Sequence, residues 1–190
     1  MRKVSNKERQ ADGPADRQTK KSVPSARCPV VPSPSLSIAL LPPRHATLDR
    51  PALRRLTRQL ITLADLPLAS LTLILTDDEH SAHFNKLLLD HDGPTDVITQ
   101  AYAPLPHEPP GLTAELYINL DRAWHVGQTA TGVSPNRELM LYIAHGLNHL
   151  AGRDDATPAQ RRAMRKRENA WLEKLAFLMP DVLYFTAHHE

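Results

Sequence analysis

The sequence predicts an α+β fold, in which a small mixed β-sheet packs against about five helices. Strand-like and helical patterns alternate along the chain from residue 36 onward. The strand-like runs are short and few, whereas the helical segments are long enough to cover a sheet. With 190 residues, of which 41% are hydrophobic, the chain is long enough for one domain with a sizeable core.

The first 34 residues differ in composition from the rest of the chain. They are rich in Lys, Arg, Ser and Pro and offer little that a core would bury. Residues 1–27 hold eight Lys or Arg against three Asp or Glu, a net charge of +5, whereas residues 28–190 hold fifteen against eighteen. We predict a disordered basic Pro/Ser-rich tail at residues 1–34 and a single domain at residues 35–190. A basic tail can touch RNA, but a merely solubilising tail is an equally good interpretation.

The cysteine content and the hydropathy pattern limit the class of protein. The single cysteine, Cys28, excludes an intramolecular disulfide framework and a Cys-rich zinc site. A metal would therefore be held by His and carboxylate side chains. No run approaches the roughly 18 apolar residues of a membrane span, and no apolar signal core follows the basic N-terminus. We expect a cytoplasmic protein without a membrane partner.

The first half of the domain alternates between strands and helices. Leu36–Leu41 is an apolar run typical of a strand, and Asp49 caps a helix that starts near Pro51. One face of that helix carries Leu53, Leu56, Leu60 and Ala64. A second strand is predicted over Ser70–Thr76, and a second helix over Asp78–Leu89.

The middle of the chain contains shorter elements. An Asp-Gly-Pro turn at residues 92–94 leads into a short extended segment, Asp96–Thr99. The proline-rich segment Pro104–Gly111 predicts a surface loop. Glu115–Leu120 predicts another strand, and Asp121 begins a short helix through Gln128.

The strongest helix signals lie in the last third of the chain. Ser134 and Pro135 provide an N-cap and a first-turn proline for a helix that ends at Gly152. Thr157 and Gln160 have capping-box spacing and start the last helix. The apolar side of this helix is formed by Met164, Trp171, Leu175 and Leu178.

His145 and His149 are the first candidate metal ligands. They are four residues apart on a predicted helix, so both rings project from one face and can bind one ion. The spacing alone is common, and such a pair also occurs at the polar edge of an amphipathic helix. Gly152 ends the helix and lets the chain fold back, which brings Asp155 within reach as a third ligand. Two imidazoles and one carboxylate leave a fourth position for water, as in catalytic zinc sites.

Gly146 follows the first of these histidines. Metalloproteases of the H-E-x-x-H type carry their general base at this position, so the sequence disfavours peptide hydrolysis of that kind. The glycine also removes side-chain bulk, which would let a backbone or a substrate come close to the ion.

Three sequence blocks occur in a fixed order: Pro94–Thr99 (PTDVIT), Glu115–Asn119 (ELYIN) and His145–Asp155 (HGLNHLAGRDD). They resemble the P-T-D-V-L-S, G-D-I-x-I and H-G-x-L-H-L-x-G-Y-D-H segments of the YbeY family of endoribonucleases, and the match covers about residues 36–178. The resemblance implies a zinc-dependent, single-strand-specific endoribonuclease with one zinc ion, acting in 16S rRNA 3′-end maturation and ribosome quality control. It also implies rRNA and the ribosome or small-subunit proteins as partners.

Carried over by position, His145 and His149 match the family's first two metal histidines. Asp155 stands where a third histidine is usual, and a carboxylate there makes bound water less acidic. Leu89 stands where many members have an arginine, so one phosphate-binding cation is missing. His91 is a candidate catalytic residue that can supply a proton or a phosphate hydrogen bond instead, although an ordinary polar turn residue is an equally good interpretation.

Further candidates surround these positions. Thr95 and Asp96 either support the site through hydrogen bonds or cap the proline turn, and the structural role is favoured. The candidate RNA-binding residues form a cationic side of the last helix: Arg161, Arg162, Arg165, Lys166 and Arg167. Such a run is often only a solvated helix face, but RNA contact is favoured because the rest of the domain is slightly acidic.

Two other functions stay open. The missing arginine at Leu89 favours a non-catalytic ribosome-assembly factor that keeps the metal as a structural clip. An unrelated metallohydrolase acting on small substrates would need a base near His145, and the sequence offers none there. The identity of a general base is likewise open for the endoribonuclease.

Overall fold

The computed structural model describes residues 33–41, 47–104, 110–176 and 183–184. These residues belong to one compact unit that begins at Pro32. Most of the predicted tail, residues 1–34, lies outside the described residues, and so does Leu178 of the predicted apolar side. Within the described part of the chain, no helix is both long and apolar enough to cross a bilayer.

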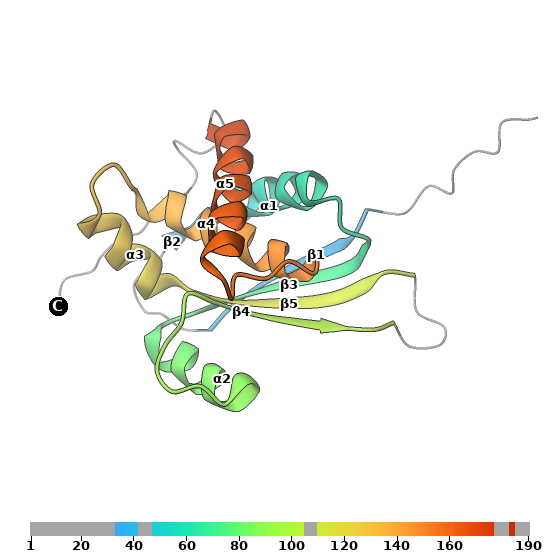
Figure 1. Ribbon diagram of the computed structural model, residues 1–190, viewed down its shortest axis with the longest axis horizontal. Helices are drawn as coiled ribbons and strands as arrows, with labels where there is room; N and C mark the ends of the chain where they lie inside the picture. The colour runs from blue at the N-terminus through green and yellow to red at the C-terminus, as the bar shows by residue number, and fades with distance from the viewer. Residues whose placement is uncertain (1–32, 42–46, 105–109, 177–182, 185–190) are drawn as a thin grey trace, which may run out of the picture. The chain divides into compact units, whose positions relative to one another are not determined.

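A four-stranded mixed β-sheet lies at the centre of the domain (Figure 1). Its strands, in the spatial order β1-β3-β5-β4, are β1 (Ser35–Leu40), β3 (Leu68–Thr76), β5 (Leu112–Asn119) and β4 (Val97–Tyr102). β1, β3 and β5 run parallel, and β4 pairs antiparallel with β5 at one edge. The predicted small mixed sheet is therefore confirmed.

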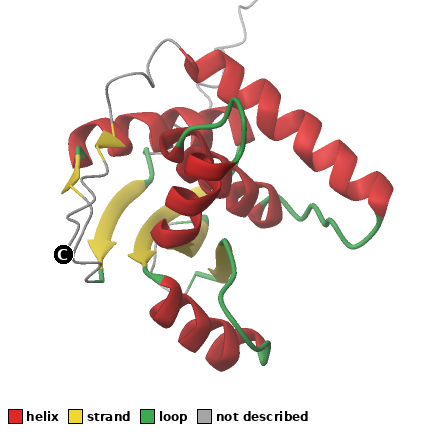
Figure 2. Cartoon of the chain, turned by 90° about the vertical axis from the view of Figure 1, so that its left-hand side faces the viewer, coloured by secondary structure: helices red, strands yellow, loops and turns green. Residues whose placement is uncertain are grey.

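Five α-helices are present among the described residues. They are α1 (Arg50–Ala64), α2 (Asp78–Leu89), α3 (Leu120–Thr129), α4 (Pro135–Leu150) and α5 (Pro158–Leu175). Figures 1 and 2 show α2 on one side of the sheet and α1, α4 and α5 on the other. This arrangement confirms the predicted α+β class with about five helices.

Neighbouring residues of β5 face opposite sides of the sheet, because side chains alternate along a strand. Leu116 is fully buried and lies against Gly146 of α4. The ring of Tyr117 packs on Phe84 of α2, with the ring centroids 4.7 Å apart. The sheet therefore has a core face beneath α1 and α4, and an opposite face that α2 covers in part.

The main core lies between the sheet and the helices α1 and α4. As its predicted apolar face requires, α1 buries Leu53, Leu56 and Leu60 completely. Each such leucine contributes roughly 1.5–3 kcal/mol relative to an exposed position. The start of α4 is fixed by Ser134, whose hydroxyl oxygen accepts a hydrogen bond from the backbone N–H of Arg137 at 3.2 Å. A capped and tightly packed α4 is a rigid support for the side chains near its other end.

The ends of all four strands of the sheet differ from the prediction, and the largest differences are in β4 and β5. The predicted segment Asp96–Thr99 corresponds to β4, which continues to Tyr102 because that residue still pairs with Thr113 of β5. The same pairing starts β5 at Leu112 rather than at Glu115. Pairing between distant segments sets both ends, and the pattern within one segment does not report it.

The predicted start of the third helix at Asp121 is wrong. Asn119 is the N-cap, and its side-chain oxygen accepts a hydrogen bond from the backbone N–H of Arg122 at 3.0 Å. The antiparallel pairing of β2 (Thr47–Leu48) with β6 (Leu183–Tyr184) was not predicted. Each of these strands supplies only two residues, which is too short for a periodic pattern.

Candidate metal centre

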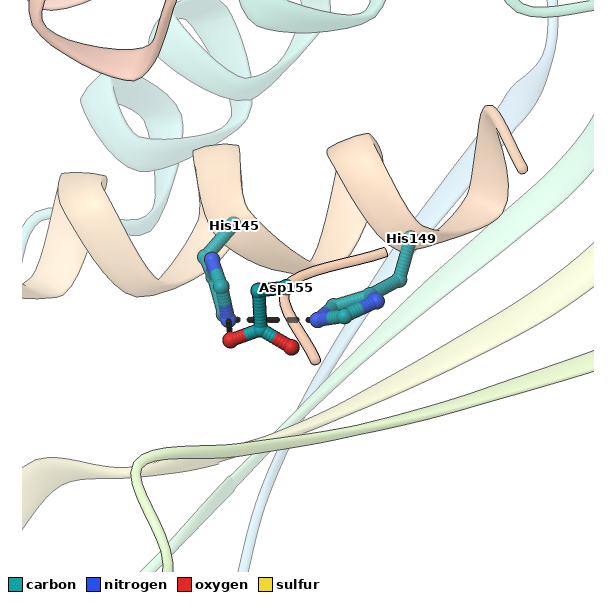
Figure 3. Close-up of side chains that lie close together, drawn as sticks. All are labelled: His145, His149 and Asp155. Carbon is teal, nitrogen blue, oxygen red and sulfur yellow. Dashed lines mark hydrogen bonds and ion pairs between the residues drawn. The ribbon is translucent and has the colours of Figure 1, made fainter. Parts of the chain in front are cut away.

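Three candidate metal ligands converge at the C-terminal end of α4 (Figure 3). His145 and His149 project from one side of the helix, and Asp155 reaches them from the following loop. The Nε2 atoms of the two histidines lie 3.2 Å apart, and Asp155 Oδ2 lies 3.7 Å from His145 Nε2. One ligand atom from each residue falls within 4.8 Å of the others. The structure thus brings together the three residues that the sequence predicted as ligands.

The loop after α4 places Asp155 beside the histidines. Gly152 has a φ of +71°, the left-handed conformation that favours glycine after a helix end. Its backbone N–H donates to the carbonyl of His149 at 2.9 Å. Farther along, Arg161 Nη1 donates to the backbone oxygens of Asp155 and Ala156 at 2.9 and 3.0 Å. The guanidinium on α5 therefore holds the returning loop in place.

The donor set fits a single zinc-sized ion. Zinc bonds of about 2.0–2.1 Å at tetrahedral angles place neighbouring ligand atoms roughly 3.3 Å apart. The 3.2 Å between the two Nε2 atoms and the 3.7 Å to Asp155 Oδ2 are close to that spacing. Two imidazoles and a carboxylate are also ligand types that zinc accepts. The residues present can therefore hold a metal ion.

Glu168 of α5 is the main feature of the site that was not predicted. Its side chain is buried, with 1% exposure, and its Oε1 accepts a hydrogen bond from His145 Nδ1 at 2.7 Å. The same oxygen accepts a second hydrogen bond from Asn148 Nδ2 at 3.2 Å. The Nδ1 side of the His145 ring is thus occupied by protein, and Nε2 is the nitrogen turned toward the other ligands.

The charges around His145 favour its protonated form when no metal is bound. Burial of the ring opposes protonation, but the hydrogen bond and charge of Glu168 outweigh this effect and raise the pKa of His145 above its usual value. The charges of Asp96 and Asp155 act in the same direction. Three carboxylates therefore give this pocket a negative field that attracts a cation.

A cavity of about 340 Å³ opens beside the ligands. His145 and Asp155 contribute to one part of its wall, and Arg161, Arg162 and Arg165 of α5 contribute to another. The cavity thus combines metal-ligating groups with guanidinium groups, and guanidinium forms strong hydrogen bonds with phosphate.

Thr95 and Asp96 form hydrogen bonds within the turn before β4. Asp96 Oδ1 accepts hydrogen bonds from the Thr95 hydroxyl at 3.1 Å and from the backbone N–H of Val97 at 2.9 Å. The Thr95 backbone is in turn fixed by Ser81, whose hydroxyl donates to the Thr95 carbonyl at 2.9 Å. Asp96 also lines the cavity beside His145, so it has a place at the site besides its role in the turn.

Other predicted residues do not line this cavity. His91 is exposed, directly after the end of α2. Leu89 is 42% exposed at the end of α2 and brings no charge to the site. Lys166 is exposed and Arg167 is half-buried, both on α5 but outside the cavity wall.

The space at Gly146 is used by the sheet and not by a substrate. A Cβ atom on this glycine would lie 2.7 Å from Leu116 Cδ2 and 3.3 Å from Thr99 Oγ1. The missing side chain lets α4 approach β5 and β4 closely. The atoms that approach Gly146 belong to side chains of the sheet, so the glycine serves the packing beneath the metal ligands.

Comparisons with known proteins identify the family of this chain. The family model described as "Endoribonuclease YbeY" matches residues 44–176, which include the three candidate ligands and Glu168. A protein named Endoribonuclease YbeY from Salinibacter ruber is 35% identical over 130 residues, which are 66% of this chain and 82% of that protein.

Two further relatives carry the same name. The one from Rhodopirellula baltica is 36% identical over 107 residues, which are 56% of this chain. The present chain spans only 54% of the length of that protein. The one from Thermobifida fusca is 32% identical over 131 residues, or 65% of this chain and 84% of that protein. Because the family model matches residues 44–176, which are most of its length, this chain belongs to the YbeY family.

Proposed function

We propose that this protein is a zinc-dependent endoribonuclease that cuts single-stranded RNA in 16S rRNA 3′-end maturation and ribosome quality control. The observation that carries the proposal is the convergence of His145, His149 and Asp155 beside a cavity that His145 and Asp155 line together with arginines. The name of the matching family and of its relatives supports an endoribonuclease activity. The proposed place of action is the cytoplasm, with rRNA and the ribosome or small-subunit proteins as partners.

The three ligands and their surroundings suit hydrolysis of a phosphodiester bond. A zinc ion held by His145, His149 and Asp155 would supply an electrophile for a phosphate oxygen and an activated water. Asp96 lies in the same cavity. Its Oδ1 is engaged by the turn, and no described residue donates to Oδ2. That free carboxylate oxygen is suited to accept a proton from the attacking water.

The cations for RNA binding come from α5. Arg162 and Arg165 line the cavity with exposed side chains, and Arg165 Nη1 lies 3.8 Å from Glu168 Oε2. Arg161 Nη1 donates a hydrogen bond to the backbone oxygen of Asp155, so the main role of Arg161 is to support the loop that carries this ligand. Because Leu89 contributes no charge, Arg162 and Arg165 must neutralise more of the phosphate charge.

A second candidate function is a ribosome-assembly factor that binds RNA or protein and keeps the metal as a structural clip. The absence of a cation at Leu89 is the observation that favours it. The two functions share the metal ligands but differ in whether the bound RNA is cut. In both, residues 1–34 are proposed to be a disordered tail and residues 35–190 the working domain.

The proposal is tested by cleavage of one unstructured RNA oligonucleotide. Wild-type protein loaded with zinc is expected to cut it, and chelator is expected to stop cleavage. His149→Ala is expected to abolish cleavage, whereas His125→Ala, which removes an exposed histidine of α3, keeps it. Cleavage that survives both chelator and His149→Ala comes from a contaminating nuclease. Zinc-loaded protein that binds RNA without cutting it would favour the assembly factor.

The role of α5 is tested by RNA affinity at two salt concentrations. Arg162→Gln with Arg165→Gln is expected to weaken binding and to make the dependence of log K on log salt less steep by about 1.4, since each phosphate contact of a single strand contributes about 0.7. A matched pair, Arg55→Gln with Arg58→Gln, removes two exposed arginines of α1 outside the cavity wall and should leave the slope unchanged. Equal slopes for both pairs would exclude α5 as the RNA contact.

A further inference from the structure

Glu168 is a buried carboxylate that neither binds the metal nor touches the RNA in the proposed reaction. It lies on α5 with 1% exposure, at the inner part of the cavity wall. Burial of a carboxylate is costly unless the charge is paired and hydrogen-bonded. The contacts that offset the cost of burying Glu168 therefore indicate its role.

The contacts of His145 indicate that role. Its Nδ1 lies 2.7 Å from Glu168 Oε1, and its Nε2 faces His149 Nε2 at 3.2 Å and Asp155 Oδ2 at 3.7 Å. A hydrogen bond from Nδ1–H to a carboxylate leaves the lone pair of a neutral imidazole on Nε2. Metal-binding histidines commonly donate their other N–H to a carboxylate or a carbonyl, which fixes the tautomer and the ring orientation.

The carboxylate is itself held from several directions. Oε1 accepts a second hydrogen bond from Asn148 Nδ2 at 3.2 Å, and Oε2 lies 3.8 Å from Arg165 Nη1. Asn148 is fixed in turn by Arg153, whose Nη1 donates to Asn148 Oδ1 at 3.3 Å. A network from α4, α5 and the loop between them therefore sets the position of the Glu168 carboxylate.

The two histidines differ in how the protein holds their rings. Among the described residues, the ring nitrogens of His149 contact only His145, and no carboxylate or carbonyl holds its other nitrogen. His145 is thus oriented by a buried carboxylate before a metal arrives, whereas His149 has no such carboxylate among the described residues. One preorganised ligand lowers the entropy cost of ordering the site around the ion.

We propose that Glu168 is a positioning residue of the metal centre, which holds the His145 ring so that Nε2 points at the ion. The inference rests on the proposed function, because it concerns the same metal site. The alternative is that Glu168 only links α4 to α5 and contributes stability without affecting how the ion is bound. The two roles predict different metal affinities in proteins of similar stability.

The test measures zinc affinity by competition with a chelator for wild type, Glu168→Ala, Glu168→Gln and Leu175→Ala. Leu175 is a buried residue of α5 with 1% exposure, so its truncation disturbs the same helix without touching His145. Glu168→Ala is expected to weaken zinc binding by about 10- to 100-fold. Glu168→Gln retains a hydrogen-bond acceptor and should lose less, whereas Leu175→Ala should lower the melting temperature and keep wild-type affinity.

A spectroscopic measurement accompanies the affinities. The visible spectrum of bound Co²⁺ reports ligand geometry, so both Glu168 variants should change its bands and Leu175→Ala should not. Wild-type affinity and spectrum in both Glu168 variants would overturn the inference, and so would an equal loss of affinity in Leu175→Ala. If circular dichroism shows that Glu168→Ala is unfolded, Glu168→Gln alone decides by the same criteria.

Wild-type measurements separate this inference from the proposed function. Wild-type protein that binds no zinc would overturn both. Wild-type protein that binds zinc but does not cut RNA would exclude the nuclease function. The zinc affinities of the Glu168 variants would then still test the positioning role of Glu168. Wild type that binds zinc and cuts RNA, with Glu168 variants that bind zinc equally well, would overturn only the positioning role.

Discussion

The two faces of the sheet are formed by alternate residues of the same strands, yet they differ in what they carry. The core face presents Leu73 and Leu116, which are fully buried beneath the helices. The opposite face presents Thr72 and Glu115 at the neighbouring pair, and both are only half-buried. Above the core face lies α4, and α5 and its preceding loop add further groups there (Figure 1). Among the described residues, a helix packs on the outside of another helix only on the core face, where α5 packs on α4.

Each side of the domain has a carboxylate that accepts two hydrogen bonds. Glu168 holds a histidine ring in a buried network, whereas Glu115 accepts from the hydroxyls of Tyr102 and Tyr117 at 3.2 and 2.9 Å. Only on the α4 side do further ligand atoms come within reach, and the described residues contain no other group of three such ligands. The difference between the two sides is that α5 and the loop before it supply additional ligand atoms and supporting groups on the α4 side.

The largest expected effect is on metal binding. His149→Ala removes one of two imidazoles, so we expect zinc affinity to fall by more than 100-fold. His91→Ala removes an exposed histidine shortly after α2, the helix on the other side of the sheet, and should leave zinc affinity unchanged. Both are measured by metal analysis after dialysis against a weak chelator. Full zinc occupancy in His149→Ala would contradict the assignment of the metal site to the α4 side of the sheet.

A pair of glycine substitutions compares how tightly the two sides are packed. A Cβ atom on Gly127 of α3 would lie 2.2 Å from Pro135 N and 2.5 Å from Pro135 Cα, at the start of α4. Because backbone atoms cannot yield, we expect Gly127→Ala to cost about 3 kcal/mol, which lowers the melting temperature by roughly 6–12 °C.

The matched control is Gly93→Ala, in the turn that follows α2. Gly93 has a φ of +84° and open space around its Cα, so the substitution meets only backbone strain, roughly 1 kcal/mol. Thermal unfolding of both variants provides the measurement. A melting temperature of Gly127→Ala equal to that of Gly93→Ala would contradict the tight packing of α3 on α4.

The charged pair at the metal site predicts a pH dependence of stability without metal. Glu168 raises the pKa of His145 despite burial of the ring, so the folded state holds this proton more tightly than the unfolded chain. The resulting stabilisation is complete below the ordinary histidine pKa of 6.5 and is lost as the pH rises through the raised pKa. Urea unfolding of the metal-free protein should show this decline, and Glu168→Gln should remove it. Identical pH profiles for both proteins would exclude the interaction.

The smallest expected effect lies on the opposite face. Burial and the neighbouring Glu115 raise the pKa of Tyr117 to about 12. Stability contributed by the neutral phenol should be lost between the ordinary pKa of 10.0 and about 12. Ultraviolet absorbance of the phenolate follows this titration, and Glu115→Gln should lower the pKa of Tyr117. Zinc should leave this titration unchanged, and a zinc-dependent shift would mean that the two faces are coupled.

The sequence predicted the features that depend on local spacing. His145 and His149 share a helix face, and the glycine after them turns the chain toward Asp155, so the ligand set needed no long-range information. The alternation of strands and helices predicted the fold class in the same way. The exact extent of β4 and β5 could not be predicted, because it depends on how far the two strands pair.

The supporting residues of the site were harder to predict. Glu168 lies 23 positions from His145 in the chain, in a helix rich in charged residues. One signal was available, since Glu168 falls on the same side of the helix as Met164 and Trp171, where a carboxylate needs a buried partner. Arg161 was predicted to contact RNA from its charge alone. Its hydrogen bonds to the loop depend on how the chain folds back, and no local pattern reports that.

The central claim is that His145, His149 and Asp155 hold one catalytic metal ion. A crystal structure of the zinc-loaded protein tests it most directly. We expect one zinc ion bound by these three side chains, with a water molecule in the fourth position open to the cavity lined by Arg162 and Arg165. A zinc ion bound elsewhere, or a fourth protein ligand that closes the site, would contradict the claim.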